Sequence, residues 1–371
     1  MQFAESDEQR DLRASVRRFL TEKSSLAAVR ELMDTPSGYD QAVWKQASDQ
    51  LGLAALAIPE EYGGAGFSVV EQAIVLEEMG RTLYCGPYLA SAVLAATALL
   101  GSADEPAKHD YLPAIAAGEL IATLAFTGDS GAWDGTDASL SAHQDGDQWR
   151  LSGHRAFVLD GHHAGLILAI AHDSAGPALF AVTGDATGLT VRSSPTLDQT
   201  RRLARLEFTD VPARRINTNG TAADLLSDTL DRAALALAAQ QLGGAQAALD
   251  MTVGYAKVRE QFGRPIGVFQ AIKHRCADLL LEIESTRSAV LYGAWAAAES
   301  SDELPTLAPL VRAYASETFS HAAAENIQLH GGIGFTWEHD AHLYFKRASF
   351  DQLFLGDPAY HRERLATRIG L

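Results

Sequence analysis

Two segments of this chain combine residues suited to holding a phosphate group. The first is Arg259-Glu-Gln-Phe-Gly-Arg-Pro-Ile-Gly-Val-Phe-Gln270, where an Arg, a Phe and a Gly come at a predicted helix end and a Pro follows. The second is Gln328-Leu-His-Gly-Gly-Ile-Gly-Phe335, where Gly331, Gly332 and Gly334 interrupt a helix. A guanidinium offers a planar fork of donors for phosphate oxygens. Glycines let backbone N–H groups approach a ligand that a Cβ would keep away. The two segments therefore predict two halves of a site for a cofactor that carries phosphate.

The same residues also allow ordinary structural interpretations. Phe262 alone would be interpreted as a core residue, and Arg259 alone as a solvated charge. Gly331 and Gly332 could simply end a helix. It is their combination at this spacing that favours a cofactor site.

Length and composition describe an ordinary globular protein. The 371 residues suffice for two or three hydrophobic cores. The net charge of −17 argues against a nucleic-acid partner, since binding a polyanion needs clustered Lys and Arg. No apolar run approaches the ~20 residues of a membrane helix, and the acidic start Met1–Arg10 does not resemble a signal peptide. We therefore expect a cytoplasmic protein with no membrane partner.

Neither the cysteines nor the histidines indicate a disulfide or a metal. Cys85 and Cys276 lie far apart in the sequence, which fits a reducing compartment. His330 has no second His or Cys at ligand spacing, and His162-His163 is interpreted as part of a turn. No metal site is predicted.

The pattern along the chain predicts an α+β protein of three domains that must position these residues. Residues 1–120 form an N-terminal helical domain, which begins with a capping box at Ser6–Gln9. Residues 121–218 alternate apolar and polar positions in short runs between Gly, Asp and Ser, which predicts a middle antiparallel β domain. Residues 222–371 form a C-terminal helical domain, opened by a long Ala-rich helix in which Gly243, Gly244 and Ala247 permit close packing.

This layout and the two segments resemble the acyl-CoA dehydrogenase family. The resemblance covers nearly the whole chain and is strongest over Tyr255–His274 and Gln328–Phe335. The turn cluster Pro59-Glu-Glu-Tyr-Gly-Gly-Ala-Gly66 supports it near the start, and it is weaker in the β domain. The family fold implies that the middle domain is barrel-like and that the C-terminal domain is a four-helix bundle.

The resemblance implies an FAD site between the subunits of a tetramer built as a dimer of dimers. Arg259 and Phe262 match the residues that contact the diphosphate and adenine side of FAD, and Gln270 matches one that helps hold the adenine. Gln328, Gly331 and Gly332 match the segment that reaches an FAD bound mainly by the neighbouring chain.

The resemblance also implies the reaction. An acyl-CoA loses its pro-R α-hydrogen as a proton and its β-hydrogen as hydride to flavin N5, which gives a trans-2-enoyl-CoA. The electrons leave through an electron-transfer flavoprotein. Because the α-proton is very weakly acidic in water, such a site must polarise the thioester carbonyl and supply a carboxylate base in a dry pocket.

The position that carries the base in most members is altered here. That segment falls on Phe354-Leu355-Gly356-Asp357, and Leu355 cannot accept a proton. A minority of the family places the base on the long helix just before an Arg, which corresponds here to Asp231-Arg232. Arg232 matches a position near the bound acyl-CoA. The alternative interpretation of Asp231 is an acid in the first helical turn that favours the helix dipole, or a partner of Arg232.

The β domain departs from the family pattern as well. The loop that contacts flavin and substrate in the family reads Thr127-Gly-Asp-Ser-Gly-Ala-Trp-Asp134, with Trp133 in place of a small serine. The family's Trp-Ile-Thr segment beside the isoalloxazine reads Phe157-Val158-Leu159, and Leu159 has no hydroxyl to offer. Two polar contacts to the redox ring are therefore expected to be lost, while the diphosphate contacts are kept.

Three functional hypotheses follow from these departures. The first is an FAD-dependent acyl-CoA dehydrogenase, or a subunit of one, as a homotetramer or as a heterotetramer with a related subunit. The second is a non-catalytic subunit that completes the FAD site of a catalytic partner, as in bacterial enzymes that degrade steroid side chains and other bulky acyl-CoAs. The third keeps the fold and changes the chemistry to a flavin oxidase or monooxygenase, which nothing positive supports.

Overall fold

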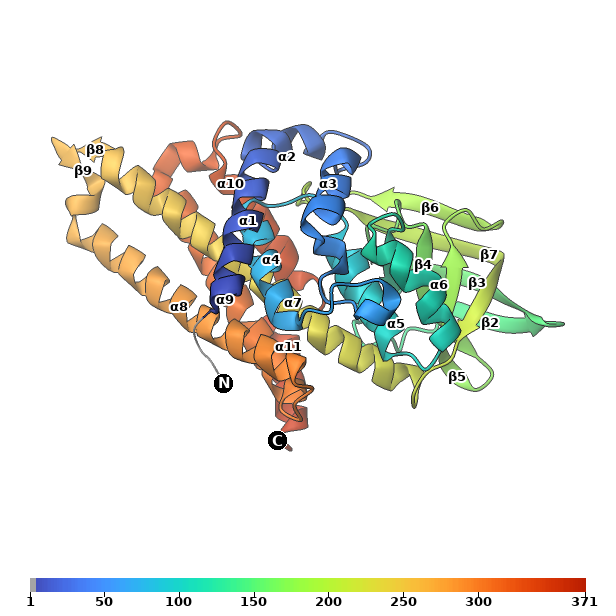
Figure 1. Ribbon diagram of the computed structural model, residues 1–371. Coiled ribbons are helices and arrows are strands. Elements are labelled where there is room, and N and C mark those ends of the chain that lie inside the picture. The colour runs from blue at the N-terminus through green and yellow to red at the C-terminus, as the bar shows by residue number, and fades with distance from the viewer. Residues whose placement is uncertain (1–4) are drawn as a thin grey trace. The chain divides into compact units, whose positions relative to one another are not determined.

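The computed structural model describes residues 5–371 of the chain (Figure 1). Its contacts divide into two compact units. The first, here the helical unit, comprises the chain up to Glu31 together with Val69–Tyr84 and Ala234–Leu371. The second, here the sheet unit, comprises Leu32–Ser68 and Cys85–Ala233. Each unit thus combines segments distant in the sequence, and the division into three domains stays a prediction.

The helical unit contains the helices that the apolar periodicity predicted. They are α1 (Asp7–Lys23), the start of α2 (Leu26–Met33), α4 (Val69–Arg81), most of α7 (Ala222–Val258), α8 (Gln270–Ala298), α9 (Leu304–His330), α10 (Ala341–Leu353) and α11 (Pro358–Arg368). Helix α9 packs against α8, α10 and α11, and α4 packs against α1 and α8. The capping box at the start of α1 is confirmed, because Ser6 and Gln9 bond each other's backbone N–H groups.

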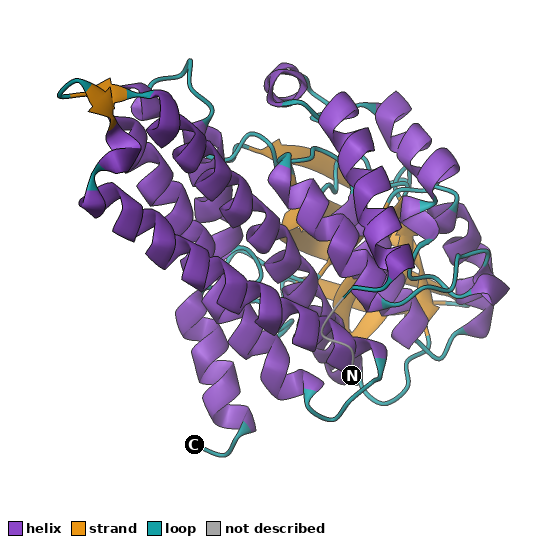
Figure 2. Ribbon diagram, turned by 60° about the vertical axis from the view of Figure 1, so that its left-hand side comes forward, coloured by secondary structure: helices purple, strands orange, loops and turns teal. Residues whose placement is uncertain are grey.

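The sheet unit combines a seven-stranded sheet with short helices (Figure 2). The helices are α3 (Gln41–Leu51), α5 (Ala96–Gly101), α6 (Glu105–Ala116) and a π-helical turn over Leu89–Ala95. The strands are β1 (Ala122–Ala125), β2 (Leu140–Asp145), β3 (Gln148–Leu159), β4 (Leu166–Asp173), β5 (Gly176–Thr183), β6 (Leu189–Ser194) and β7 (Leu203–Ile216). Apolar side chains such as Phe180, Leu206 and Val211 fill its core.

The sheet is mixed, which corrects the prediction of a purely antiparallel one. Hairpin neighbours such as β2 and β3 are antiparallel, but β1 runs parallel to β4, and β2 meets β4 in parallel at Ser141 and His172. Strands β1 and β4 are not joined by a turn, so no hairpin imposes an antiparallel direction on them. Strand β1 and the residues 166–171 of β4 are buried throughout, as parallel strands usually are. Because β4 also pairs with β5, the pairings β4–β2–β3–β7–β5–β4 form a closed ring.

Helix α7 lies very close to α4 because both helices carry glycine at the crossing. A Cβ added to Gly243 would stand 1.8 Å from the carbonyl oxygen of Glu77, and one added to Gly80 would stand 1.9 Å from that of Gln240. No real Cβ tolerates such distances, so the two helices could not keep this spacing with alanine at either position. The close packing expected for Gly243 is confirmed.

We expect Gly243→Ala to destabilise the protein by about 1–3 kcal/mol, because the new methyl must push α4 and α7 apart. Gly254→Ala is the matched control on the same helix, since nothing lies within 4 Å of its added Cβ. That control should be neutral or stabilising by up to about 1 kcal/mol, because alanine favours helix more than glycine does. Urea unfolding of both variants measures the difference, and equal effects would contradict the packing argument.

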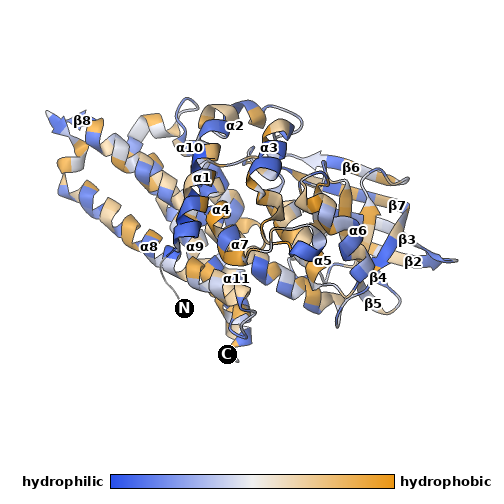
Figure 3. Cartoon of the chain, viewed as in Figure 1, coloured by the Kyte–Doolittle hydropathy of each residue, from blue (hydrophilic) through white to orange (hydrophobic). Residues whose placement is uncertain are grey.

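Hydropathy is distributed unevenly among the elements (Figure 3). Helix α1 is mostly hydrophilic and buries only Val16 and Leu20 completely, whereas every residue of the π-helical turn Leu89–Ala95 is buried. Among the helices of residues 5–371, none combines the length and the apolarity that crossing a membrane requires.

Candidate functional site

The arginine segment forms a tight hairpin at the end of α7. The helix ends at Val258, and the short strands β8 (Glu260–Gln261) and β9 (Arg264–Pro265) pair on either side of Phe262 and Gly263. Both turn residues have positive φ, of 54° and 74°, as a type I′ turn requires. Phe262 is 90 % exposed at the tip. Its interpretation as a core residue is therefore wrong, and the strained turn presents an aromatic ring to the outside.

Arg259 stands at the base of this hairpin with its side chain exposed. Its backbone is held, because its N–H donates to the Tyr255 carbonyl and its own carbonyl accepts from Ile266, at 2.8 Å in both cases. Within residues 5–371, no acceptor binds its guanidinium. By contrast, Arg264 lies 4.6 Å over the ring of Phe269. Arg259 is thus an anchored, exposed cation whose donors are available to a ligand.

Gln270 is the first residue of α8 and is also exposed. The preceding residue, Phe269, makes no side-chain cap to the helix. The N–H groups of Gln270 and Ala271 remain as donors, whereas the next two donate to the Phe269 carbonyl, and the positive end of the helix dipole points the same way. Both features suit a negatively charged or polar group of a ligand.

The glycine segment ends helix α9. Gly331 has φ 64° and ψ −143°, a conformation that side chains other than glycine's rarely adopt. A Cβ added to Gly331 or Gly332 would meet no atom within 4 Å, so nothing within the described chain requires Gly332 to be small. Gln328 is exposed one turn earlier. The open space beside these backbone groups agrees with a ligand that approaches them.

The structure brings the two segments together within one chain. The rings of Tyr255 and His330 lie against each other in a tilted arrangement at a centroid distance of 4.3 Å, so the ends of α7 and α9 lie side by side. The hydroxyl of Thr252 and the amide of Asn326 add a hydrogen bond of 3.0 Å between the same two helices. His330 Nδ1 lies 2.7 Å from the Asn326 carbonyl, and burial lowers the pKa of its ring. His330 is therefore a packing residue that aligns the two motifs.

The loop at the usual base position keeps its backbone without a carboxylate. Leu355 has φ 62° and is only 3 % exposed, and Gly356 follows with φ 101°. His361 lies with Nε2 3.0 Å from the Leu355 carbonyl, and the fully buried Arg312 donates to the Phe354 carbonyl at 2.9 Å. Asp357 is the N-cap of α11, where its carboxylate accepts the N–H of Tyr360. No acid is thus directed into this loop from Leu355–Asp357.

We expect His361 to make the stability of the protein depend on pH. Burial, and next the charge of Arg312, lower the pKa of His361 from 6.5 to about 3. Between those values the unfolded chain takes up a proton that the folded chain refuses, so stability falls as pH falls, by up to about 1.4 kcal/mol per unit. His361→Gln removes this dependence. Urea midpoints at neutral pH and near pH 4 should therefore differ less in the variant, and parallel losses would contradict the assignment.

Asp231 and Arg232 lie in the part of α7 that belongs to the sheet unit. Helix α7 begins at Ala222, so Asp231 is well beyond the first turn and its interpretation as a dipole-favouring terminal acid is wrong. Its side chain is buried, with 3 % of the residue exposed. Arg232 Nε bonds Asp228 Oδ2 at 3.0 Å. Since adjacent helical residues do not face each other, Asp231 and Arg232 present their groups in different directions.

The loop over Thr127–Asp134 is held within the sheet unit by its own contacts. Asp129 pairs with His154 at 3.0 Å and with Arg205. The ring of Trp133 lies 6.1 Å from that of Phe126. Leu159 is 2 % exposed, which directs its side chain into the core. Where the family has polar groups that contact the flavin, this chain therefore has apolar side chains, at Trp133 and Leu159, or a side chain paired within the sheet unit, at Asp129.

Phe157 is a candidate that the sequence reasoning passed over. The register between β3 and β7 shifts between Arg155 and Val158, which places Phe157 in a bulge with φ 55°. Its ring is 39 % exposed in a strained conformation that bulky residues rarely adopt. The only signal in the sequence for a role of Phe157 was its position in the segment that matches the family's Trp-Ile-Thr. The bulge itself could not be predicted, because it depends on pairing with a distant strand.

The two adjacent histidines of the sheet unit have a structural role. His162 and His163 both face the Ser37 carbonyl, and burial lowers the pKa of His162 to about 4. In the part of the chain that the structure describes, no group of three or more His, Cys, Asp or Glu side chains is arranged to hold a metal.

Comparisons with known proteins agree with this geometry. Residues 6–119 match the acyl-CoA dehydrogenase N-terminal domain, and residues 223–370 match the acyl-CoA dehydrogenase C-terminal domain. The chain is 38 % identical to acyl-CoA dehydrogenase IpdE2 of Mycobacterium tuberculosis, over 98 % of both chains. The chain therefore belongs to the acyl-CoA dehydrogenase family, whose members are FAD-dependent oxidoreductases that act on the CH–CH bond of acyl-CoA thioesters.

Two solved structures are similar along the whole chain. A variant of the Tcur3481-Tcur3483 steroid ACAD has a TM-score of 0.89 at 33 % identity, with 98 % of each chain covered. The ChsE4-ChsE5 complex from Mycobacterium tuberculosis has a TM-score of 0.91 at 30 % identity, with 100 % of this chain and 99 % of that chain covered.

Proposed function

We propose that this chain is a subunit of an FAD-dependent acyl-CoA dehydrogenase that converts an acyl-CoA to its trans-2-enoyl-CoA and passes the electrons to an electron-transfer flavoprotein. The observation that carries this proposal is the pairing of the arginine hairpin with the glycine break in one chain. Arg259 offers a guanidinium without a partner in the described chain, and Gly331 and Gly332 expose backbone at the end of α9, which lies beside the end of α7. These groups fit the diphosphate of FAD.

Each cofactor residue has a distinct role in this proposal. Arg259 holds the diphosphate, the exposed ring of Phe262 covers the adenine side, and Gln270 bonds the adenine portion. The segment Gln328–Gly332 approaches the same cofactor with its backbone. Because the ends of α7 and α9 lie side by side, one protomer presents both segments to the same FAD, which is otherwise bound mainly by the neighbouring chain.

The proton-abstracting step is assigned to Asp231. FAD, when bound, accepts the β-hydrogen as hydride. Asp231 removes the α-proton, since it is a buried carboxyl in the family's alternative position, whereas Leu355 has no carboxyl. A carboxylate kept from water is a stronger base than one in solution. Arg232 lies near the acyl-CoA and is kept in place by Asp228.

The assembly that we propose is a tetramer, homomeric or with a related subunit. Large apolar side chains are exposed around the proposed cofactor site, among them Phe262 at 90 %, Phe335 at 83 % and Val258 at 75 %. Exposed apolar groups of this size near a shared cofactor are typical of subunit interfaces. The similar ChsE4-ChsE5 structure is a complex of two different chains, which supports the heteromeric form.

A non-catalytic role within such a heteromer is the second candidate. It is favoured by Leu355 in place of the base, by Leu159 buried in the core and by Trp133 in the loop where a small serine is expected. In this form the chain supplies Arg259 and Gln328 to the FAD of a catalytic partner. Both forms keep the cofactor grip and differ only in the chemistry at Asp231.

The substrate class that we propose is a bulky acyl-CoA, such as a steroid side-chain thioester, handled in the cytoplasm. This rests on the similar structure described as a steroid ACAD. The experiment is to purify the chain alone and together with a related subunit, measure FAD per chain, and mix each with acyl-CoAs. Bleaching of the flavin by the chain alone supports the catalytic form. If FAD appears only in the complex, bleaching that survives Asp231→Asn in this chain supports the second candidate, and bleaching that is lost supports the catalytic form. No FAD in either preparation refutes both.

A further inference from the structure

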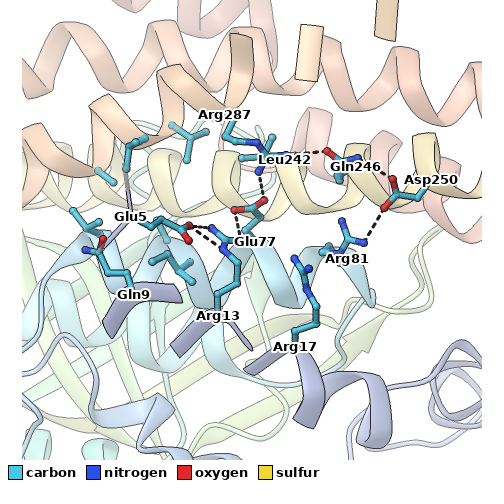
Figure 4. Close-up of a pocket in the computed structure, with 16 residues that line it drawn as sticks. Glu5, Gln9, Arg13, Arg17, Glu77, Arg81, Leu242, Gln246, Asp250 and Arg287 are labelled. Atoms are coloured by element: carbon cyan, nitrogen blue, oxygen red, sulfur yellow. Dashed lines mark hydrogen bonds and ion pairs between the residues drawn. The ribbon is translucent and has the colours of Figure 1, made fainter. Parts of the chain in front are cut away.

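A cavity of about 480 Å³ lies inside the helical unit, and none of the proposed cofactor or substrate residues lines it (Figure 4). Helices α1, α4, α7 and α8 line it. Its floor is apolar and includes Val70, Ile74, Leu242, Val290 and Leu291. Its volume falls within the range of pockets for small ligands, about 300–1,000 Å³.

Four arginines surround this floor, namely Arg13 and Arg17 from α1, Arg81 from α4 and Arg287 from α8. In Figure 4, Arg13 and Arg287 reach Glu77 from opposite sides, and Arg81 meets Asp250. Each of these four arginines is paired with a carboxylate, so none of the four guanidinium groups is unpaired in this structure. Whether it can accept an anion depends on which of these carboxylates can leave.

Two of the carboxylates are fixed. The side chains of Glu77 and Glu78 are 7 % and 1 % exposed, and each is held by two arginines. Glu78 receives Arg17 Nε at 2.8 Å and Nη2 at 2.7 Å, which is a bidentate pair. Withdrawing a buried, doubly paired carboxylate would leave uncompensated charge, so these two stay in place.

Of the carboxylates nearer the rim, Asp250 is the one that can leave. Asp250 is 51 % exposed and pairs with Arg81 at 2.8 Å. Glu5, with 27 % of its side chain exposed, precedes helix α1 and pairs with Arg13. Asp250 is half exposed, and exposed ion pairs contribute little to stability, so turning Asp250 into water costs little. Arg81 then presents a guanidinium without its carboxylate beside an apolar floor.

We propose that this cavity binds an amphipathic anion, a carboxylate or phosphate head on an alkyl or ring body. The body lies on the floor between α4, α7 and α8. The head replaces the carboxylate of Asp250 at Arg81. This site is independent of the dehydrogenase function proposed above, because no residue assigned to FAD or acyl-CoA lines it.

Calorimetric titration of the purified full chain tests the proposal. The probes are decanoate and octyl phosphate, which carry both an alkyl chain and an anionic head group. Two partial probes accompany them: 1-octanol has the alkyl chain without a charge, and inorganic phosphate has the charge without an alkyl chain. We expect one site per chain for the two amphipathic anions and at least about tenfold weaker binding for both partial probes, since each lacks one of the two contributions. The head group that binds more tightly distinguishes a fatty acid from an alkyl phosphate. Equal binding of inorganic phosphate would overturn the proposal.

Two rim variants should change this affinity in opposite directions. Arg81→Gln should weaken decanoate binding about tenfold, because a charge-assisted hydrogen bond is lost. Asp250→Asn should strengthen it severalfold, because the competing carboxylate is gone while the amide oxygen still accepts from Gln246, as Asp250 now does at 2.9 Å. Arg18→Gln on the exposed side of α1 is the control and should change nothing. If neither rim variant changes the affinity for decanoate, the ligand binds elsewhere and the proposed site is refuted.

Discussion

Arg259→Ala is expected to fold normally and to lose its FAD when the protein is desalted. The guanidinium has no partner among the described residues, and only the backbone of Arg259 is hydrogen-bonded. Removing the side chain therefore costs the fold little. A hydrogen bond to a charged group contributes about 1.5–3 kcal/mol. That corresponds to an FAD dissociation constant about 10- to 100-fold higher. Fluorescence titration of the apoprotein with FAD measures this constant in wild type and variant.

Arg275→Ala is the matched control for this measurement. Arg275 lies on α8 a few residues after Gln270, is similarly exposed and pairs with Glu325 at 3.4 Å. Its loss removes the same charge from the same region without touching the hairpin. FAD affinity should stay within about twofold, since distant surface charges are largely screened at physiological salt. If both variants weaken FAD equally, the effect is one of net charge, and the assignment of Arg259 to the diphosphate is wrong.

Asp231→Asn is expected to abolish flavin reduction by acyl-CoA while FAD stays bound. The amide is nearly isosteric with the carboxyl and cannot accept the α-proton. General-base contributions are about 10²–10⁴-fold, so the single-turnover rate of flavin bleaching should fall by that factor. Stopped-flow absorbance gives the rate, and the FAD content of the same sample checks that the cofactor site is intact.

Asp228→Asn separates a base from a nearby negative charge. Asp228 lies one turn earlier on α7, is half exposed and holds Arg232. Its variant should alter the substrate concentration needed for half-maximal bleaching and leave the maximal rate nearly unchanged. An unchanged rate in Asp231→Asn would remove Asp231 as the base. If the wild-type chain itself never bleaches, in isolation or in a complex, Asp231 has no catalytic role and the non-catalytic form is favoured.

Much of the fold was predictable because its signals are local. The capping box of Ser6 and Gln9 acts over three residues, and the long helix α7 follows from an Ala-rich sequence with helical periodicity. The hairpin at Phe262 was not predicted, although its residues were singled out. Its type I′ turn places a bulky aromatic at positive φ, against local preference, and the sequence carries no signal for that.

The direction of β1 and the bulge at Phe157 were beyond sequence reasoning for a different reason. Both depend on pairing with strands far along the chain, β4 for the first and β7 for the second. Such pairings are chosen by the burial of whole faces in the assembled sheet. The interpretation of Asp231 as a terminal acid was wrong because α7 begins at Ala222, more than two turns before Asp231.

The sequence by itself determined the chemistry that this chain can carry: a guanidinium and glycines at cofactor spacing, and Leu355 where a base would stand. Residue types decide which groups can donate, accept or ionise, and no fold can add a carboxyl to a leucine. Only the tertiary structure decided that Tyr255 and His330 bring the two motifs together, and that four arginines from three helices surround one apolar cavity. Those arrangements arise from contacts between helices distant in the chain, whose relative positions are set by packing and not by any local pattern.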